Sequence, residues 1–255
     1  MSEENHKGER IAKVMARAGL CSRREAEAWI EAGRVKVNGE RLQSAACVVG
    51  VEDKIEVDGK ALGRAEDTRL FLYHKPSGLV TSHKDERGRK TVFDALRSLD
   101  FPGRLPRVMS VGRLDLNTEG LLLLTNDGGL SRYLELPATG WSRRYRVRVL
   151  GAVDEARLAD LKGGITVEGV RYKSIEAKLE QTGKSGANRW IFVTLREGKN
   201  REIRRVMEAL GLQVNRLIRV GYGPFELNKL PSGGVQEVEA RVMKAQIPGY
   251  FKDCV

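Results

Sequence analysis

Five polar side chains crowd positions 113–119, just ahead of a run of four leucines at 121–124. Because an apolar run fixes a strand in the core, the polar loop joined to it is held rigidly, and such loops are where catalytic groups usually lie. An Asp in this loop is equally suited to capping a turn. The residues alone therefore leave a catalytic and a structural role for Asp115 open. The five polar residues are Arg113, Asp115, Asn117, Thr118 and Glu119.

Residue types that hold metals or nucleotides are sparse. The three cysteines (Cys21, Cys47 and Cys254) form no Cys-x-x-Cys pair, and the three histidines show no metal-binding spacing. No Gly-rich phosphate loop with the Gly-Lys-Ser/Thr ending and no Gly-x-Gly-x-x-Gly turn occurs, which argues against triphosphate and dinucleotide chemistry. We therefore expect a protein that works without a metal and without a cofactor.

Positive charge is unevenly distributed along the chain. The 255 residues carry a formal charge of +11. Residues 1–60 are balanced, with eleven basic and eleven acidic residues, so residues 61–255 hold the whole excess. Such a surplus points to a polyanionic partner, either nucleic acid or an anionic membrane surface.

The sequence offers little that would suit a membrane or export. No run approaches the roughly eighteen apolar residues of a membrane helix, and no long basic amphipathic helix is present to lie on a membrane surface. The first ten residues, MSEENHKGER, lack an apolar stretch for export. We therefore expect a cytoplasmic protein whose partner is a nucleic acid.

Two helices are expected near the N-terminus. Apolar residues recur at helical spacing over residues 11–18, and Gly19 ends that helix. Ser22 followed by Glu25 is a capping box, which predicts a second helix over residues 23–31.

Short strands follow these helices. Residues 35–39 (VKVNG) and 55–59 (IEVDG) each predict a strand that enters a tight turn. Residues 1–60 are thus expected to form a small α/β module. The polar stretch 61–68 is expected to be a linker, and residues 69–255 a larger domain.

The larger domain mixes short strands with short helices. Strands are predicted at 70–73, 108–111, 120–125, 145–150, 172–179, 190–195 and 214–220. Helices are predicted at 91–99, 130–136, 154–161 and 201–210. Long crossover helices are too few for a doubly wound parallel sheet. We therefore expect an α+β protein, in which the larger domain has a mixed, largely antiparallel sheet flanked by helices.

The N-terminal pattern resembles a known RNA-binding domain. The sequence RIAKVMARAGLCSRREAEAWIEAGRVKVNGE, followed by EDKIEVDGK, is similar to the S-four-type domain named after a small-subunit ribosomal protein. In that family the paired helices and the following strand present a basic surface to structured RNA. The resemblance implies that Arg17, Arg23, Arg24 and Arg34 face phosphate. The alternative is that they are ordinary solvated surface charges.

The rest of the chain resembles RNA pseudouridine synthases of the ribosomal group. GRLDLNTEGLLLLTNDG at 112–128 is similar to their signature, and three further segments agree with the family in order. With the first domain, these four long motifs extend the likeness over nearly the whole chain, a far more specific signal than one short pattern. The three segments are YHKPSGLVTS, RRYRVRV and LREGKNREIRRVMEALGLQVNRLIRVGYGPF.

The resemblance assigns roles to individual residues. Asp115 corresponds to the essential Asp of the family, which acts on the sugar or on the base. The family pairs that Asp with a basic residue of the C-terminal motif, which by position is Arg204, with Arg205 as the alternative. Tyr145 corresponds to a Tyr that stacks on the target uracil and is a candidate for removing the proton from carbon five. Arg113 matches an Arg that helps to displace the target nucleotide.

The implied function is the site-specific, cofactor-free isomerisation of a flipped-out uridine to pseudouridine in ribosomal RNA. Large-subunit RNA, or its assembly precursor, is the expected partner. A synthase acting on small-subunit RNA and a non-catalytic RNA-binding factor for ribosome assembly are the alternatives. We expect a monomer with no small-molecule partner, and the tail 246–255 matches no pattern that we can interpret.

Overall fold

The computed structural model describes residues 8–102, 104–181 and 187–252, which form two compact units. The small unit holds the chain up to Thr68 together with the short segments 105–108 and 126–128. The large unit holds the remaining residues.

Two helices build the small unit, α1 (Ile11–Arg17) and α2 (Arg23–Glu31), and α2 begins at a side-chain cap. The Ser22 hydroxyl accepts a hydrogen bond from the Glu25 backbone N–H, and the Glu25 carboxylate accepts one from the Ser22 N–H. This confirms the predicted capping box, which satisfies two N–H groups that the helix itself cannot pair. Both helices bury apolar side chains in one core, among them Ile11 and Ile30.

A small sheet completes the unit, in the order β3 (Glu40–Arg41), β2 (Val35–Val37), β5 (Ile55–Val57), β6 (Lys60–Ala61). Asn38 and Gly39 join the first two strands with φ values of 53° and 85°, which is the type I′ geometry that Asn-Gly favours. A separate pair joins β1 (Glu9–Arg10) to β4 (Val48–Val49). Since β6 ends at Ala61, the sheet runs one residue past the predicted end of the module at residue 60. The division into residues 1–60, 61–68 and 69–255 stays a prediction.

The large unit is built on one nine-stranded sheet, whose main path is β13-β14-β10-β15-β9-β7-β17 with β8 paired to β9 and β16 to β15. The strand pairs are antiparallel except β9 with β15, so the predicted mixed, largely antiparallel sheet is confirmed. Its strands are β7 (Leu70–Lys75), β8 (Met109–Ser110), β9 (Glu119–Thr125), β10 (Arg143–Leu150), β13 (Ile175–Leu179), β14 (Asn188–Leu195), β15 (Gln213–Tyr222), β16 (Phe225–Glu226) and β17 (Val235–Val238).

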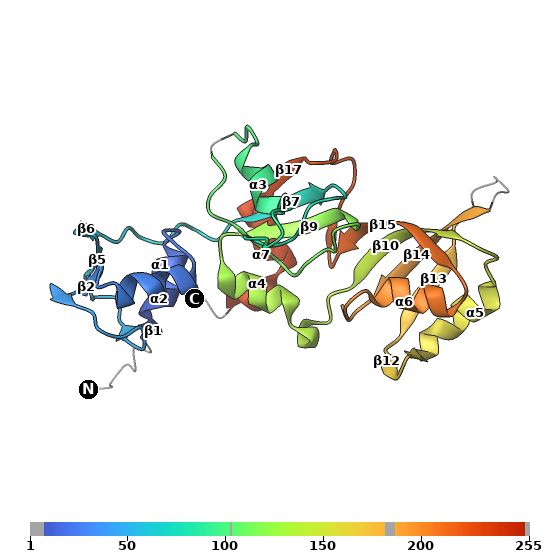
Figure 1. The fold of residues 1–255 in the computed structure, drawn as a ribbon, viewed down its shortest axis with the longest axis horizontal. Helices are drawn as coiled ribbons and strands as arrows, with labels where there is room; N and C mark the ends of the chain where they lie inside the picture. The colour runs from blue at the N-terminus through green and yellow to red at the C-terminus, as the bar shows by residue number, and fades with distance from the viewer. Residues whose placement is uncertain (1–7, 103, 182–186, 253–255) are drawn as a thin grey trace. The chain divides into compact units, whose positions relative to one another are not determined.

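Helices cover the two faces of this sheet (Figure 1). The core beneath α5 and α6 includes Leu217 of β15, whereas the core beneath α4 and α7 is contacted by the next residue, Ile218. Because successive strand residues point to opposite faces, the two cores lie on opposite sides of the sheet. The helices are α3 (Val92–Arg97), α4 (Gly128–Glu135), α5 (Glu155–Asp160), α6 (Glu202–Ala209), α7 (Ala240–Gln246) and α8 (Pro248–Phe251), with two short 3-10 turns at Pro137–Thr139 and Leu161–Gly163.

One predicted strand is wrong and several C-terminal elements were not predicted. The stretch 172–179 is not one strand, because Tyr172 ends β12 (Val170–Tyr172), which forms a hairpin with β11 (Ile165–Val167), before β13 begins. Residues 173 and 174 between them belong to neither strand, and the Lys173 N–H donates to Glu197. β17, α7 and α8 follow the last predicted strand. In the described part of the chain, no helix has both the length and the apolar character needed to cross a membrane.

Candidate active site

The loop that carries Asp115 runs from β8 to β9, and hydrogen bonds to its successive carbonyl groups fix its backbone. The Thr81 hydroxyl donates to the Leu114 carbonyl (2.8 Å) and accepts from the Leu114 N–H (3.4 Å). The Asp115 carbonyl accepts from the Thr118 N–H (3.0 Å), and the Leu116 carbonyl accepts from the Gly78 N–H (2.8 Å). Both residues that flank Asp115 are therefore anchored to the segment that follows β7.

The side chain of Lys75 binds the backbone of the same loop. It is the last residue of β7 and is fully buried. Its ammonium donates to the carbonyls of Pro76 (3.0 Å), Leu116 (3.3 Å) and Thr118 (2.9 Å). Burial lowers the pKa of Lys75 to about 8, partly opposed by the negative charges of Asp115 and Glu119. A buried cation thus binds three carbonyls, two of which belong to the loop that carries Asp115.

Asp115 itself is partly open to solvent, and its nearest cation is Arg201. The Arg201 Nη1 lies 3.9 Å from Asp115 Oδ2, and the two side chains are 53% and 37% exposed. Sequence reasoning assigned this pairing to Arg204 or Arg205. Arg204 instead donates to the Asn117 carbonyl (3.0 Å) and the Val214 carbonyl (3.2 Å), so it binds the backbone of the Asp115 loop. Burial lowers the pKa of Arg204, and Arg201 lowers it further.

Helix geometry explains this arrangement. Arg201 is the N-cap residue of α6 in the left-handed conformation (φ 52°), and Arg204 lies three residues further on. Residues three apart share a helix face, so both arginines reach the loop. Arg205 is rotated by about 100° from Arg204 around the helix. The structure therefore gives Arg201 and Arg204 two different tasks, one at the carboxylate and one at the backbone.

Sheet register brings Tyr145 close to the start of β9. Tyr145 of β10 lies opposite Arg219 of β15, and Arg219 lies opposite Gly120 of β9. A β-bulge between Arg144 and Tyr145 alters the register there, and such bulges re-aim side chains. Tyr145 is half-buried and packs against the core under α5 and α6, on the face that carries α6.

Gly120 permits the close approach of β9 and β15. Its φ is +102°, and a Cβ there would lie 2.2 Å from the Arg219 carbonyl oxygen. Arg219 is 2% exposed, and its Nε donates to the Leu121 carbonyl (2.7 Å). A side-chain hydrogen bond therefore connects the parallel strands β9 and β15 in addition to their backbone pairing.

Sequence reasoning missed Arg201, Thr81, Arg219 and Lys75. Arg201 stands in the same motif as Arg204, and their three-residue spacing is a signal that could have shown both on one helix face. The roles of Thr81 and Arg219 depend on contacts with residues far away in the sequence, Leu114 and Leu121, which no local pattern reveals. Arg113, predicted to help displace the nucleotide, is exposed on the loop two residues before Asp115.

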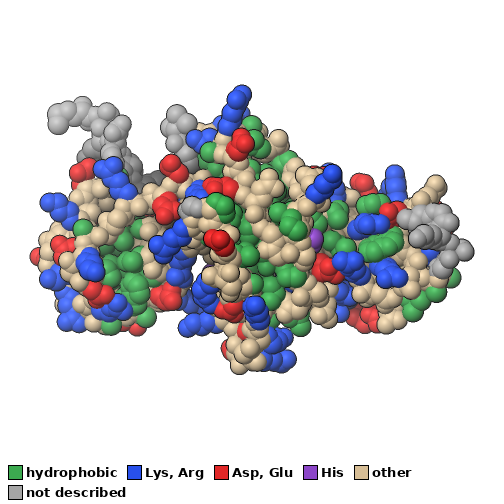
Figure 2. All heavy atoms as spheres, turned by 90° about the horizontal axis from the view of Figure 1, so that it is seen from above, with side chains coloured by type: hydrophobic (Ala, Val, Ile, Leu, Met, Phe, Trp, Pro, Cys, Tyr) green, Lys and Arg blue, Asp and Glu red, His purple; other side chains and the backbone are tan. Residues whose placement is uncertain are grey.

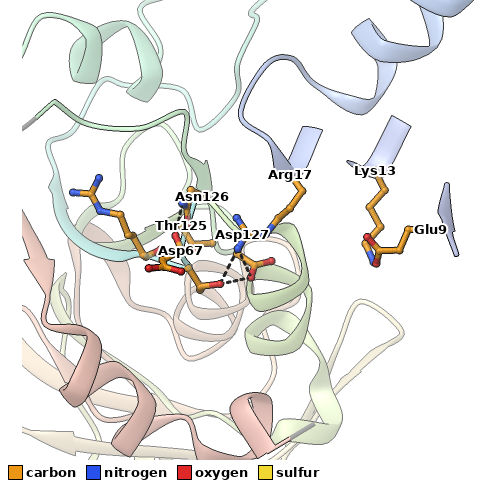
Figure 3. A network of polar contacts seen from close by, with 9 residues as sticks. Glu9, Lys13, Arg17, Asp67, Thr125, Asn126 and Asp127 are labelled. Carbon is orange, nitrogen blue, oxygen red and sulfur yellow. Dashed lines mark hydrogen bonds and ion pairs between the residues drawn. The ribbon is translucent and has the colours of Figure 1, made fainter. Parts of the chain in front are cut away.

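The four arginines predicted to face RNA in the small unit differ in what they already bind. Arg34 makes a two-point ion pair with Asp58 (2.9 and 2.5 Å) and lies over the Trp29 ring. Figure 3 shows Arg17 at Asp127, 3.5 Å away, and its second partner is the Thr68 hydroxyl at 3.0 Å.

Arg23 and Arg24 are exposed in the first turn of α2, and within the described residues neither makes an ion pair or a side-chain hydrogen bond. The same turn holds one carboxylate, that of Glu25, which caps the helix. The two arginines together with the positive end of the helix still leave this turn with an excess of positive charge, which a bound anion would offset.

Basic side chains are mixed with other kinds on the face that Figure 2 shows. Figure 2 shows Lys and Arg interleaved with acidic and hydrophobic side chains over the visible face. In the described part of the chain, no three His, Cys, Asp or Glu side chains come together as a metal site would require.

Known proteins similar to this chain share both parts of it. Residues 69–209 match the family described as RNA pseudouridylate synthase, and residues 9–55 match the S4 domain. An uncharacterized RNA pseudouridine synthase of Rickettsia felis is 45% identical, over 92% of this chain and 99% of its own length. The ribosomal large subunit pseudouridine synthase B of Shigella flexneri is 46% identical, over 91% and 80%. A crystal structure of a pseudouridylate synthase superposes with a TM-score of 0.61 at 29% identity, covering 92% of this chain and 99% of that one.

Proposed function

The chain belongs to the RNA pseudouridylate synthase family, and on that premise we propose that it converts a specific uridine of large-subunit ribosomal RNA to pseudouridine. As a member of this family with an S4 domain, it is an isomerase that acts on RNA. The observation that carries the proposed chemistry is the Asp115 loop, in which buried donors fix the backbone around one accessible carboxylate.

The reaction needs a carboxylate and a place for a uracil to turn. The bond between N1 and the sugar C1′ breaks, the detached base rotates, and a bond forms between C5 and C1′. The proton on C5 is lost and N1 gains one, so the product is an isomer of the substrate. Asp115 supplies the carboxylate that opens this sequence, because an ionised Asp near neutral pH is the form that attacks or accepts a proton.

Arg201 orients that carboxylate, a role supported by its position 3.9 Å from Asp115. Tyr145 stacks on the extruded uracil, and its hydroxyl removes the C5 proton; its place on the face that carries α6 supports this role. Arg204 holds the Asn117 carbonyl, and Arg113 fills the space that the flipped base leaves.

The small unit holds the RNA. Arg23 and Arg24 stand at the positive end of α2 with no described partner, which favours a phosphate there. Arg34 and Arg17 are predicted to add to this surface by exchanging Asp58 and Asp127 for phosphate, and Arg205 to contact RNA beside the large unit's site. The excess positive charge of residues 61–255 draws the RNA to the large unit.

The choice of large-subunit RNA rests on relatives such as the Shigella flexneri protein, whose name states that substrate. A substrate of this kind would place the protein in the cytoplasm, as a monomer on its RNA.

Mapping pseudouridines across all ribosomal RNA tests the proposal. RNA from cells that lack this protein should lose one or a few pseudouridines in the large subunit, and restoring the gene should return them. Loss confined to the small subunit would favour the alternative substrate. An unchanged map would leave the non-catalytic assembly factor as the better explanation and contradict the proposal.

A further inference from the structure

We propose that Glu202 is a positioning residue for Arg201, and that it acts by sharing one proton with Glu197 beneath the turn that carries Arg201. The inference rests on the proposed role of Arg201 at Asp115. Neither the family resemblance nor the motif spacing assigned a role to Glu202 or Glu197.

Glu202 fastens the turn 199–202. It is the first residue of α6 and is 3% exposed. One of its oxygens, Oε2, accepts from the Lys199 N–H (2.9 Å), and the Glu202 N–H donates to the Lys199 carbonyl (3.2 Å). These two bonds close a loop of four residues, in which Arg201 adopts its left-handed conformation. A non-glycine residue held at positive φ needs such support, because the conformation is strained.

Glu197 is the acidic neighbour of Glu202, and each of the two carboxyls shifts the pKa of the other. Oε1 of Glu202 is buried and has no hydrogen-bond partner within the described residues. Two carboxylates cannot bond to each other unless one carries a proton. Glu197 is already satisfied as an anion, since it accepts from the Lys173 N–H (2.6 Å) and the Lys199 ammonium (2.9 Å). The shared proton therefore belongs to Glu202.

The charges around the pair agree with this assignment. Burial raises the pKa of Glu202 to about 7, and the negative charge of Glu197 raises it further against the Lys199 N–H and ammonium. Burial also raises the pKa of Glu197, but the Lys173 and Lys199 hydrogen bonds outweigh it and lower the pKa overall. Lys199 is held in turn over the Tyr172 ring and donates to the Arg171 carbonyl, so a single ammonium serves both acids.

The sign of the pH effect follows. Below pH 7 Glu202 is neutral and donates to Glu197, which keeps the turn closed and Arg201 beside Asp115. Above pH 7 the buried carboxylate of Glu202 and the neighbouring carboxylate of Glu197 repel each other, the turn opens, and Arg201 loses its position. Because the pKa of Glu202 is higher in the folded state than its usual 4.5, the folded state binds more protons between these values. The free energy of unfolding therefore falls as pH rises through that window.

Glu202→Gln is the sharpest test, because the amide can accept from Lys199 and donate to Glu197 at every pH. Single-turnover rates are measured with enzyme in excess over a ribosomal RNA fragment that holds the target uridine. Between pH 7 and 8.5 the wild-type rate should fall about tenfold, as expected when only the protonated form is competent. Glu202→Gln should show no such fall, whereas the matched variant Glu208→Gln, an exposed acid of the same helix, should keep it. A fall of equal size in Glu202→Gln would overturn the proposal.

A second measurement needs no turnover. The 15N signal of the Arg201 Nε–H, identified by its loss in Arg201→Lys, should shift with a midpoint near pH 7 in the wild type and stay constant in Glu202→Gln. An Arg201 signal that titrates alike in both proteins would overturn the link between Glu202 and Arg201. If the protein modified no RNA, the proposed function would fail, yet this titration would still decide whether Glu202 positions Arg201.

Discussion

The Asp115 loop and the arginines of the small unit are both polar, but they are held in opposite ways. Around Asp115, the carbonyls of residues 114–118 accept from Thr81, Thr118, Gly78, Arg204 and Lys75, and Lys75 is fully buried. Arg23 and Arg24 instead stand exposed in the first turn of α2, without described partners.

This difference matches the two proposed functions, catalysis at Asp115 and RNA binding by the small unit. A carboxylate that must meet one atom of a substrate gains from a backbone fixed within a fraction of an ångström. Cations that attract phosphate act through long-range fields, which tolerate movement and weaken with salt. Changes around the loop should therefore lower the rate at saturating enzyme, and changes in the small unit should lower RNA affinity.

Arg201→Ala should give the largest effect among the residues around Asp115. Removing the charge that faces the carboxylate should lower the single-turnover rate by about 100-fold, comparable to the loss of one charge-stabilising donor in an active site. RNA affinity, measured by filter binding, should change little. Arg205→Ala is the matched control on the same helix. If Arg205→Ala lost as much rate as Arg201→Ala, the ion pair with Asp115 would not be the cause.

Lys75→Met should follow, because it affects the whole loop. The change leaves the Pro76 and Thr118 carbonyls without their buried donor, at about 1–3 kcal/mol for each unsatisfied group. We expect a lower free energy of unfolding in urea and a rate reduced by about tenfold or more. Lys90→Met, which removes an exposed lysine of the same unit, should change neither quantity. A folded Lys75→Met protein with the wild-type rate would show that the loop needs no such support.

Thr81→Val should have a smaller effect on the same loop. It keeps the shape of the side chain but removes the hydroxyl that bonds both backbone groups of Leu114. A rate lower by about three- to tenfold is expected, since the loop keeps its other anchors. Thr166→Val, at an exposed position of β11, is the control. If Thr81→Val lowered only RNA affinity and not the rate, the proposed difference between the Asp115 loop and the small unit would be contradicted.

Replacing both Arg23 and Arg24 by Ala should give the smallest effect on rate and a clear effect on binding. The slope of log affinity against log salt should decrease by about two, roughly one for each phosphate that is no longer neutralised. The rate at saturating enzyme should stay within about twofold of wild type. Lys60→Ala removes one exposed charge from the same unit and should change the slope by less. An unchanged slope in the double variant would remove these arginines from the RNA-binding surface.

Local signals in the sequence predicted local structure well. The Ser22 cap starts α2 at the predicted residue, because the capping box uses only residues within one turn. The helices predicted to begin at 91 and 154 begin one residue later, with Thr91 and Asp154 as their N-caps. The Asn38-Gly39 turn likewise depends on two adjacent residues. The mixed sheet could be expected as a class, but not the parallel pairing of β9 with β15, which joins residues about one hundred positions apart.

The candidate site was predictable in part for the same reason. A motif brought attention to Asp115, and the family resemblance placed a cation of the C-terminal motif beside it. Whether that cation is Arg201 or Arg204 depends on how α6 is rotated against the loop, which the packing of Ile203, Val206 and Met207 decides. The rotation of a helix against a distant loop cannot be predicted from the spacing of residues in the sequence.

Replacing Asp115 with Asn tests the central claim most directly, because it removes the charge and keeps the size of the side chain. Release of tritium from C5-labelled uridine in a large-subunit RNA fragment reports each turnover, and filter binding of the same fragment reports affinity. We predict that Asp115→Asn releases no tritium above background while it binds the fragment within about twofold of wild type, since the variant lacks the reacting group but keeps every cation that faces phosphate. Turnover within tenfold of wild type would contradict the account.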